Sequence, residues 1–242
     1  MGTSGFSYRD WRGTVYPPGL PAAQWLGYYA NLLPTLELNV TFYRIPALKT
    51  LRNWIGQTPD GFLFSVKMLR SLTHARDGQH LPAFLQAIDP LRQEHRLAAV
   101  LAQFPPSFRP DPANQDYLRR LVEEMGDCPL VVEMRHPQWL AEKGLAMLAG
   151  LLVSLGYADD ARWKSRMAGL DFPARPVGYV RFHGRNPRVR YDYAYSGAEL
   201  KEWLPRLTRL DRDCARTLVY FNNCYRGQAL ESIAILANLL TI

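Results

Sequence analysis

Several short apolar stretches of this 242-residue sequence carry side chains that could act as acids, bases or anion ligands. Glu133-Met-Arg135 and Arg181-Phe-His183 each place two such groups two residues apart, so that they share one face of an extended strand. A carboxylate such as Glu37 or Glu133 can serve as a general base, and an imidazole as a general acid. Guanidinium groups bind phosphate through paired hydrogen bonds. These residue types permit chemistry on a phosphate ester, and they equally permit other chemistry.

Eight strand-like stretches are available to position these groups. They begin on average about every 31 residues, the length of a strand, a helix and two short loops. The stretches are Gly2–Phe6, Thr35–Tyr43, Phe62–Met68, Leu97–Phe104, Leu130–Met134, Tyr157–Asp160, Val177–Gly184 and Thr217–Asn223.

Helical periodicity fills most of the intervals between the strands. Apolar residues recur three and four apart in Ala22–Leu33, Leu140–Leu155, Glu199–Leu210 and Ala229–Leu240. Gly156 follows the second of these helices at the position of a C-cap glycine. Ala161–Pro176 lacks the pattern and contains two prolines, so we expect a loop in place of the sixth helix.

Eight β-then-α units without a linker predict one (β/α)8 TIM barrel, a single domain spanning residues 1–242. A doubly wound open sheet is the main competitor. That fold more often carries a glycine-rich phosphate loop after an early strand, and Gly2-Thr3-Ser4-Gly5 does not have the required spacing. We therefore favour the barrel.

Polar residues gather where the strands end. In the second stretch the alternation puts Glu37, Asn39, Thr41 and Tyr43 on the interior face, opposite Leu36, Leu38, Val40 and Phe42. The carboxyl ends of barrel strands are where active sites lie. The catalytic candidates are Glu37, Glu133, His136, Asp159 and His183, and the substrate-binding candidates are Asn39, Tyr43, Lys67, His74, Gln103, Arg135, Arg181, Asn222 and Asn223. Alternatively, Glu37 with Arg181, or Glu133 with Arg135, are buried ion pairs that satisfy one another.

The same residues carry a resemblance to a known family. Gly2-Thr3-Ser4-Gly5-Phe6-Ser7-Tyr8, the run from Glu37 to Pro46, Gln103 to Phe108, Glu133 to His136, Tyr179 to Gly184 and Tyr220 to Asn223 follow one another in order along the chain. This series resembles the YecE-like family, domain of unknown function 72. The resemblance implies a TIM barrel and leaves the activity open.

Three kinds of chemistry follow from these candidates. The first is hydrolysis of a phosphate ester or phosphodiester, in nucleic acid or a sugar phosphate, with the basic side chains holding the phosphate. A divalent metal on Glu37, Glu133, Asp159 and His183 is a variant that we do not favour, because Arg135 and Arg181 would lie close to the ion. Nucleophilic catalysis by Cys224 or Ser4 is a weaker hypothesis. The sequence identifies no cofactor.

The alternative is a nucleic-acid or phosphate-binding module without chemistry. Tyr8, Trp11, Tyr16, Tyr43 and Trp139 are predicted near the strand ends, where aromatic rings stack on bases or brace the loops. We expect bracing for Trp11 and Trp139. A net charge of +7 and a pI near 9.4 favour an anionic partner, a small molecule or nucleic acid.

Composition also predicts the cellular setting. The three cysteines form no CxxC pair and leave an odd count, which favours a reducing compartment. We find no apolar targeting segment after Met1 and no apolar run long enough to cross a bilayer. We therefore expect a cytoplasmic protein without a membrane partner. The oligomeric state cannot be predicted.

Overall fold

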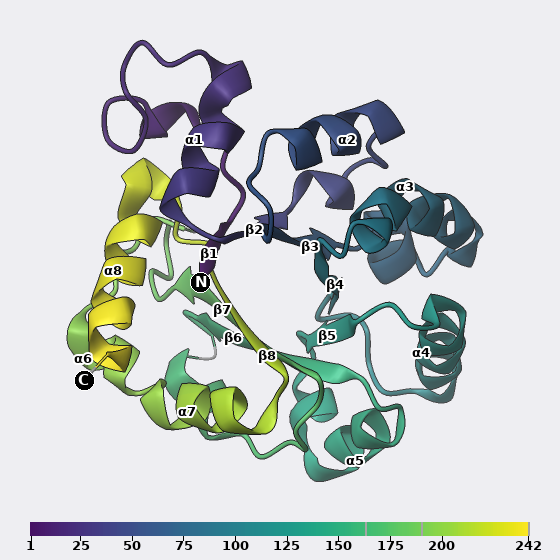
Figure 1. Ribbon diagram of the computed structural model, residues 1–242. Helices are drawn as coiled ribbons and strands as arrows, with labels where there is room; N and C mark the ends of the chain where they lie inside the picture. The colour runs from purple at the N-terminus through teal and green to yellow at the C-terminus, as the bar shows by residue number, and fades with distance from the viewer. Residues whose placement is uncertain (163, 190, 242) are drawn as a thin grey trace.

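Eight parallel strands close into a barrel, each paired with its neighbours in sequence and β8 paired with β1 (Figure 1). The computed structural model describes residues 1–162, 164–189 and 191–241, and the side chains of all of these except 164–166. The strands are β1 Gly2–Ser4, β2 Thr35–Leu38, β3 Leu63–Lys67, β4 Leu97–Phe104, β5 Leu130–Met134, β6 Ser154–Asp160, β7 Val177–Gly184 and β8 Arg216–Phe221. The predicted (β/α)8 fold is confirmed.

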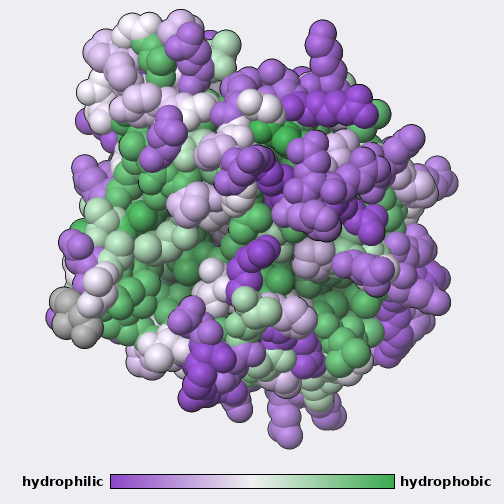
Figure 2. Space-filling view, viewed as in Figure 1, coloured by the Kyte–Doolittle hydropathy of each residue, from purple (hydrophilic) through white to green (hydrophobic). Residues whose placement is uncertain are grey.

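Helices surround the barrel and leave its two mouths to the loops (Figure 1). They are α1 Trp25–Leu32, α2 Leu48–Gly56, α3 Leu81–Gln93, α4 Pro112–Met125, α5 Glu142–Gly150, α6 Gly197–Lys201, α7 Leu204–Asp213 and α8 Gln228–Leu240. Figure 2 shows hydrophilic side chains gathered over α2, α3 and α4, with more apolar surface toward the middle of the same face. The described part of the chain contains no helix with the length and apolar character to span a membrane.

Side-chain alternation sorts the strand residues into two sets. In β7, Val180 and Phe182 pack with the helices in the main core, whereas Tyr179 belongs to a separate cluster inside the barrel. That inner cluster is apolar at its base, with Ala99, Leu101, Val131, Val177 and Leu218. Because successive side chains point to opposite faces, the inward set of each strand ends in a polar layer at the carboxyl ends.

The predicted boundaries differ from the observed ones in β2 and β6. β2 ends at Leu38, and Val40–Phe42 forms a 3-10 turn, so the alternation predicted as far as Tyr43 stops early. The predicted helix Leu140–Leu155 was too long. Gly156 is not its C-cap but lies inside β6 opposite Tyr179. An added Cβ at Gly156 would lie 3.2 Å from Glu133 Cβ, so the glycine makes room for that side chain.

The segment between β6 and β7 carries no α-helix among its described residues. It contains only the 3-10 stretch Lys164–Gly169. The loop predicted there in place of the sixth helix is confirmed. Between β7 and β8, the structure has two helices, α6 and α7, where the sequence predicted the single helix Glu199–Leu210. The chain turns between Lys201 and Leu204.

Candidate functional site

A chain of ion pairs fills the barrel near the carboxyl ends of its strands. The guanidinium of Arg181 donates to Glu37 Oε1 at 2.8 Å and to Glu133 Oε2 at 2.9 Å. Arg135 in turn pairs with Glu133 and with Asp160. Each carboxylate therefore contacts at least one guanidinium.

Burial and pairing fix the protonation of this network. Glu37, Glu133 and Arg181 have no exposed surface. Burial raises the pKa of Glu37, but Arg181 and the Tyr179 hydroxyl, 2.6 Å from Oε2, outweigh it and hold the pKa below its ordinary value. The pKa of Glu133 is held well below its ordinary value, because Arg135 and Arg181 outweigh burial. Both carboxylates are charged and enclosed.

The network decides between two hypotheses for these residues. Glu37, Glu133 and Arg181 were predicted to contact a ligand in an open pocket, with the alternative that they form matched buried pairs. The side chains converge as predicted, but they are sealed from solvent in pairs. In this structure they lie beneath the open space and do not line it.

Asp159 does not join the network. Its carboxylate faces the outer helices, where it accepts hydrogen bonds from Arg185, from the Tyr195 hydroxyl at 2.9 Å and from Trp203 Nε1 at 2.8 Å. Asp160, the next residue, falls on the inward side and pairs with Arg135. Asp159, a catalytic candidate from the sequence, therefore does not reach the cavity, because the alternation along β6 gives the inward position to Asp160.

His183 is held as a neutral imidazole. Arg135 Nη2 lies 2.8 Å from Nε2, and a guanidinium can only donate, so Nε2 accepts and Nδ1 carries the proton. Asn222 Nδ2 lies 2.9 Å from Nδ1. Since two N–H groups cannot bond to each other, a protonated Nδ1 requires the Asn222 amide to be turned so that Oδ1 accepts. Burial, with Arg181 nearby, lowers the pKa of His183 to about 4. At neutral pH this residue cannot supply the acid predicted for it.

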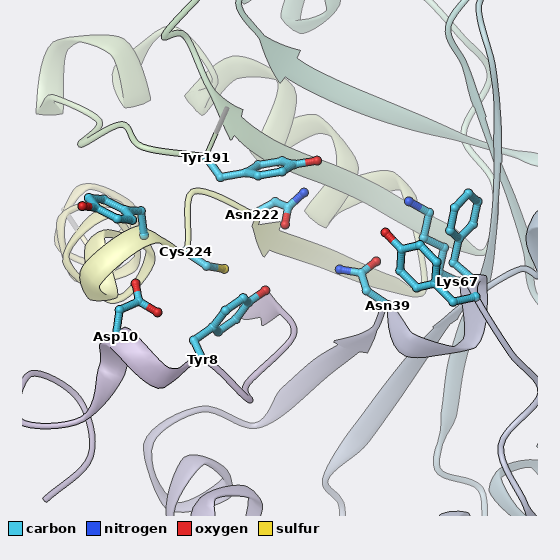
Figure 3. A pocket seen from close by; sticks show the side chains of 10 residues that line it. Tyr8, Asp10, Asn39, Lys67, Tyr191, Asn222 and Cys224 are labelled. Atoms are coloured by element: carbon cyan, nitrogen blue, oxygen red, sulfur yellow. The ribbon is translucent and has the colours of Figure 1, made fainter. Parts of the chain in front are cut away.

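A cavity of about 630 Å³ opens at this end of the barrel. Figure 3 shows Asn222 between the rings of Tyr191 and Tyr8, with Asn39 toward Lys67 at one end and Asp10 at the other end. The lining residues come from five loops or strand ends: Tyr8, Asp10, Asn39, Phe42, Tyr43, Lys67, Tyr191, Asn222, Cys224 and Tyr225. The cavity combines aromatic walls with two amide groups, the Lys67 ammonium group, the Asp10 carboxylate and the Cys224 thiol.

Lys67 is the basic group that lines this cavity. Its Nζ donates to Gln103 Oε1 at 3.0 Å and lies 4.5 Å from the centre of the Phe42 ring. No carboxylate of the described residues lies within 4 Å of it. Burial and the charge of Arg181 lower its pKa to about 8, against the smaller opposing effect of Glu37.

Four predicted binding residues line the cavity: Asn39, Tyr43, Lys67 and Asn222. Gln103 supports Lys67 from beneath and also accepts from Arg181.

Three other predicted residues, His74, Asn223 and His136, do not line the cavity. The ring of His74 packs edge-on against Phe42 at 5.1 Å, and burial lowers its pKa. Asn223 is fully buried and donates to Tyr193 O and Ser232 Oγ, so it does not reach the cavity. His136 caps the 3-10 turn after β5, where its Nδ1 accepts from the backbone N–H of Gln138.

Sequence analysis missed several lining residues. Phe42 was expected to face the helices, but it lines the cavity because β2 ends before it. Tyr191 and Tyr225 lie in loops whose course has no periodic signal in the sequence. Trp11 and Trp139 are fully buried and donate to Cys224 O and Phe108 O, so they brace the loops as expected.

The cysteine and metal hypotheses find little support in this geometry. Cys224 lines the cavity, but burial raises its pKa to about 12, which disfavours the nucleophilic thiolate. The proposed metal set loses Asp159, which faces outward. Among the described residues, no three His, Cys, Asp or Glu side chains are grouped as metal ligands would be.

The fold and the position of the cavity define the chain as a (β/α)8 barrel protein with an open site at the carboxyl ends of its strands. It belongs to the family described as protein of unknown function DUF72, which it matches over residues 1–242. The resemblance to that family is confirmed.

Individual relatives agree with this assignment. The chain is 28% identical to UPF0759 protein YunF of Bacillus subtilis, over 100% of this chain and 94% of that one. A DUF72 family protein of Thermotoga maritima superposes with a TM-score of 0.85 at 36% identity, covering 100% of this chain and 98% of that one. One from Enterococcus faecalis gives a TM-score of 0.77 at 23% identity, covering 90% and 93%, and supports the fold.

Proposed function

We propose that this barrel binds a single nucleic-acid strand across its carboxyl-terminal mouth, with one unstacked base or sugar in the aromatic cavity. The observation that carries the proposal is the distribution of arginines. Six of the loops that follow strands each contribute at least one exposed arginine, among them Arg9, Arg44, Arg70, Arg109, Arg188 and Arg226. We call this set the mouth arginines.

The mouth arginines are available to a ligand. None of their guanidinium groups lies within 4 Å of a carboxylate of the described residues, in contrast to Arg119 and Arg209 on the outer helices. The backbone N–H of Arg226 donates to Asp10 Oδ2 at 2.6 Å, which leaves its guanidinium unpaired. Three of them, Arg9, Arg44 and Arg226, are chain neighbours of residues that line the cavity. Unpaired guanidinium groups on a rim attract phosphate backbones.

The aromatic lining favours an unpaired base over a duplex. Tyr43 is 78% exposed and Tyr225 41% exposed, so both rings are accessible to a ligand. The Arg226 guanidinium lies over the Tyr225 ring, 5.1 Å from its centre. Stacking of bases on such rings is tolerant of sequence and requires bases that are free of their complement. The lysine ammonium and the amides of Asn39 and Asn222 then offer hydrogen bonds to a sugar or phosphate.

Hydrolysis of a phosphate ester is the reaction predicted from the sequence, and it is the less supported part of the function. It needs Glu37 or Glu133 as a base, and both are enclosed in ion pairs. Binding requires no change in the network. The cytoplasmic location likewise stays a prediction from the cysteine count.

Fluorescence anisotropy with a labelled single-stranded oligonucleotide tests the proposal at several salt concentrations. The variant Arg9→Gln/Arg44→Gln/Arg226→Gln should bind at least tenfold more weakly at low salt, with a salt slope smaller by about 2, since each single-strand phosphate contact contributes about 0.7. Arg52→Gln/Arg92→Gln/Arg120→Gln removes the same charge from outer helices and should leave the slope unchanged. Equal losses in both variants, or no binding by the native protein, would overturn the proposal. Product analysis of the same oligonucleotide tests for cleavage.

A further inference from the structure

Lys67 differs from the buried charged groups beneath the cavity. Glu37, Glu133 and Asp160 each pair with an arginine. Lys67 Nζ instead contacts a neutral amide oxygen and an aromatic ring. An ammonium ion that is partly desolvated and lacks a counter-ion is disfavoured relative to the free amine.

The free amine is populated at physiological pH. With a pKa of about 8, roughly a tenth of Lys67 is uncharged at pH 7, whereas an exposed lysine with a pKa of about 10.4 is uncharged in well under a thousandth of molecules. Desolvation beside a second cation is a known way to make a lysine nucleophilic. Here Arg181 supplies that cation from the interior network.

The position of the amine gives it access to a ligand. Lys67 closes β3 on the inward face and forms one end of the 630 Å³ cavity (Figure 3). The cavity also holds the amides of Asn39 and Asn222, which can hydrogen-bond to the hydroxyls of a sugar. A carbonyl carbon on a molecule seated there would be open to attack from Lys67.

We propose that Lys67 forms an imine with the aldehyde of a phosphorylated sugar held in the cavity. The Nζ lone pair bonds to the carbonyl carbon, and a proton passes from nitrogen to oxygen to give a carbinolamine. A second proton makes that hydroxyl leave as water, and the C=N bond of the iminium ion forms. The step needs no oxidant or reductant.

The phosphorylated sugar has two sources with the same chemistry. One is a free sugar phosphate in its open-chain form. The other is an abasic nucleotide within a strand, whose ring-opened sugar is an aldehyde flanked by phosphates. The phosphate in this inference rests on the proposed function, whereas the amine chemistry rests on Lys67 alone.

Reductive trapping tests the inference. The intact protein is incubated with sodium cyanoborohydride and either ribose 5-phosphate or an oligonucleotide containing one abasic site, and adducts are located by peptide mass mapping. We expect one adduct, at Lys67. The probe that gives the higher rate of adduct formation identifies the source, a free sugar phosphate or an abasic nucleotide. The exposed Lys49, Lys143 and Lys201 serve as internal references. Adducts spread evenly over these lysines with both probes would refute the proposal.

Two variants distinguish nucleophilicity from folding or charge. Lys67→Arg keeps the positive charge but cannot form the imine, and should lose the adduct. Gln103→Glu places a carboxylate beside Nζ, raises the pKa of the amine, and should slow trapping at pH 7 by about tenfold. Undiminished trapping in Gln103→Glu would contradict the role assigned to the unpaired amine.

The outcome is separable from that of the proposed function. Strand binding that depends on the mouth arginines, without any adduct at Lys67, would refute the imine and leave the binding proposal intact. An adduct with ribose 5-phosphate in a protein that binds no strand would support the imine and refute the binding proposal.

Discussion

Replacement of Arg181 by methionine is expected to destabilise the protein strongly at neutral pH. The buried guanidinium bridges Glu37 and Glu133. Without it Glu133 still has Arg135, but Glu37 is left with the neutral hydroxyl of Tyr179. Loss of one partner from a buried ion pair costs about 3–5 kcal/mol, because the other charge stays behind uncompensated. In a chain of this length such a loss lowers Tm by roughly 6–20 °C.

Urea unfolding at pH 7 measures the free-energy difference, and two controls isolate its cause. The double variant Glu37→Gln/Arg181→Met removes both charges, so it should recover roughly half of the loss or more. Arg119→Met breaks the exposed pair with Asp116, and should change the free energy of unfolding by no more than about 1 kcal/mol.

The loss should also depend on pH. In the native protein the lowered pKa of Glu37 gives stabilisation that is complete above the ordinary glutamate pKa of about 4.3 and disappears as pH falls through the lowered value. In Arg181→Met, burial acts on Glu37 without the guanidinium and raises its pKa, so the penalty is greatest at high pH and shrinks as the carboxyl takes up a proton. The gap between the two proteins should be smaller at pH 5 than at pH 7. Equal stability at pH 7, or a gap independent of pH, would refute the assignment of Arg181 as the counter-ion of Glu37.

Three further predictions concern packing, orientation and protonation. Gly156→Ala should lower the free energy of unfolding by about 1–3 kcal/mol, because its Cβ meets Glu133, whereas Gly150→Ala, with open space around it, should be neutral or slightly stabilising in urea unfolding. Asp159→Asn should destabilise by about 1–3 kcal/mol while ligand affinity at the cavity stays unchanged, since its partners lie on the helix side; a selective loss of binding would contradict this orientation. In ¹⁵N NMR at pH 6, His183 should be neutral with its proton on Nδ1, and a protonated ring would be inconsistent with the hydrogen bond from Arg135. Because the pKa of His183 is lowered to about 4, the protein should lose stability as pH falls from about 6.5 toward 4.

Periodicity predicted the barrel because strands, with a period of two, alternate along the chain with helices, whose apolar residues recur three and four apart. Three strands, β4, β5 and β7, begin and end as the sequence predicted. The same alternation placed Glu37, Glu133, Arg181 and His183 in one layer. It failed at Phe42, because the 3-10 turn Val40–Phe42 ends the alternation, so that Phe42 lines the cavity beside Tyr43.

Whether a polar side chain is exposed or paired depends on its neighbours across the barrel, and no single stretch of sequence contains that information. Glu37 and Arg181 are 144 residues apart, and the pairing becomes visible only when the strands close. The aromatic cavity depends equally on loops, because Tyr191 and Tyr225 are positioned by turns without a period. Sequence therefore predicts which layer holds the charges, while the structure is needed to separate enclosed pairs from groups that face a ligand.

The enclosed pairs nevertheless bear on the chemistry of the cavity. Glu37 and Glu133 both act to raise the pKa of Lys67, and Arg181 and Arg135 act to lower it. If the carboxylates faced the lysine without their arginines, the ammonium ion would be stabilised and its nucleophilicity lost at neutral pH. Apolar residues in their place would offer no nearby cation to disfavour the ammonium form. A layer of carboxylates that are each neutralised by an arginine is thus the arrangement that keeps one amine at the cavity wall unpaired and partly uncharged, although no member of the layer lines the cavity.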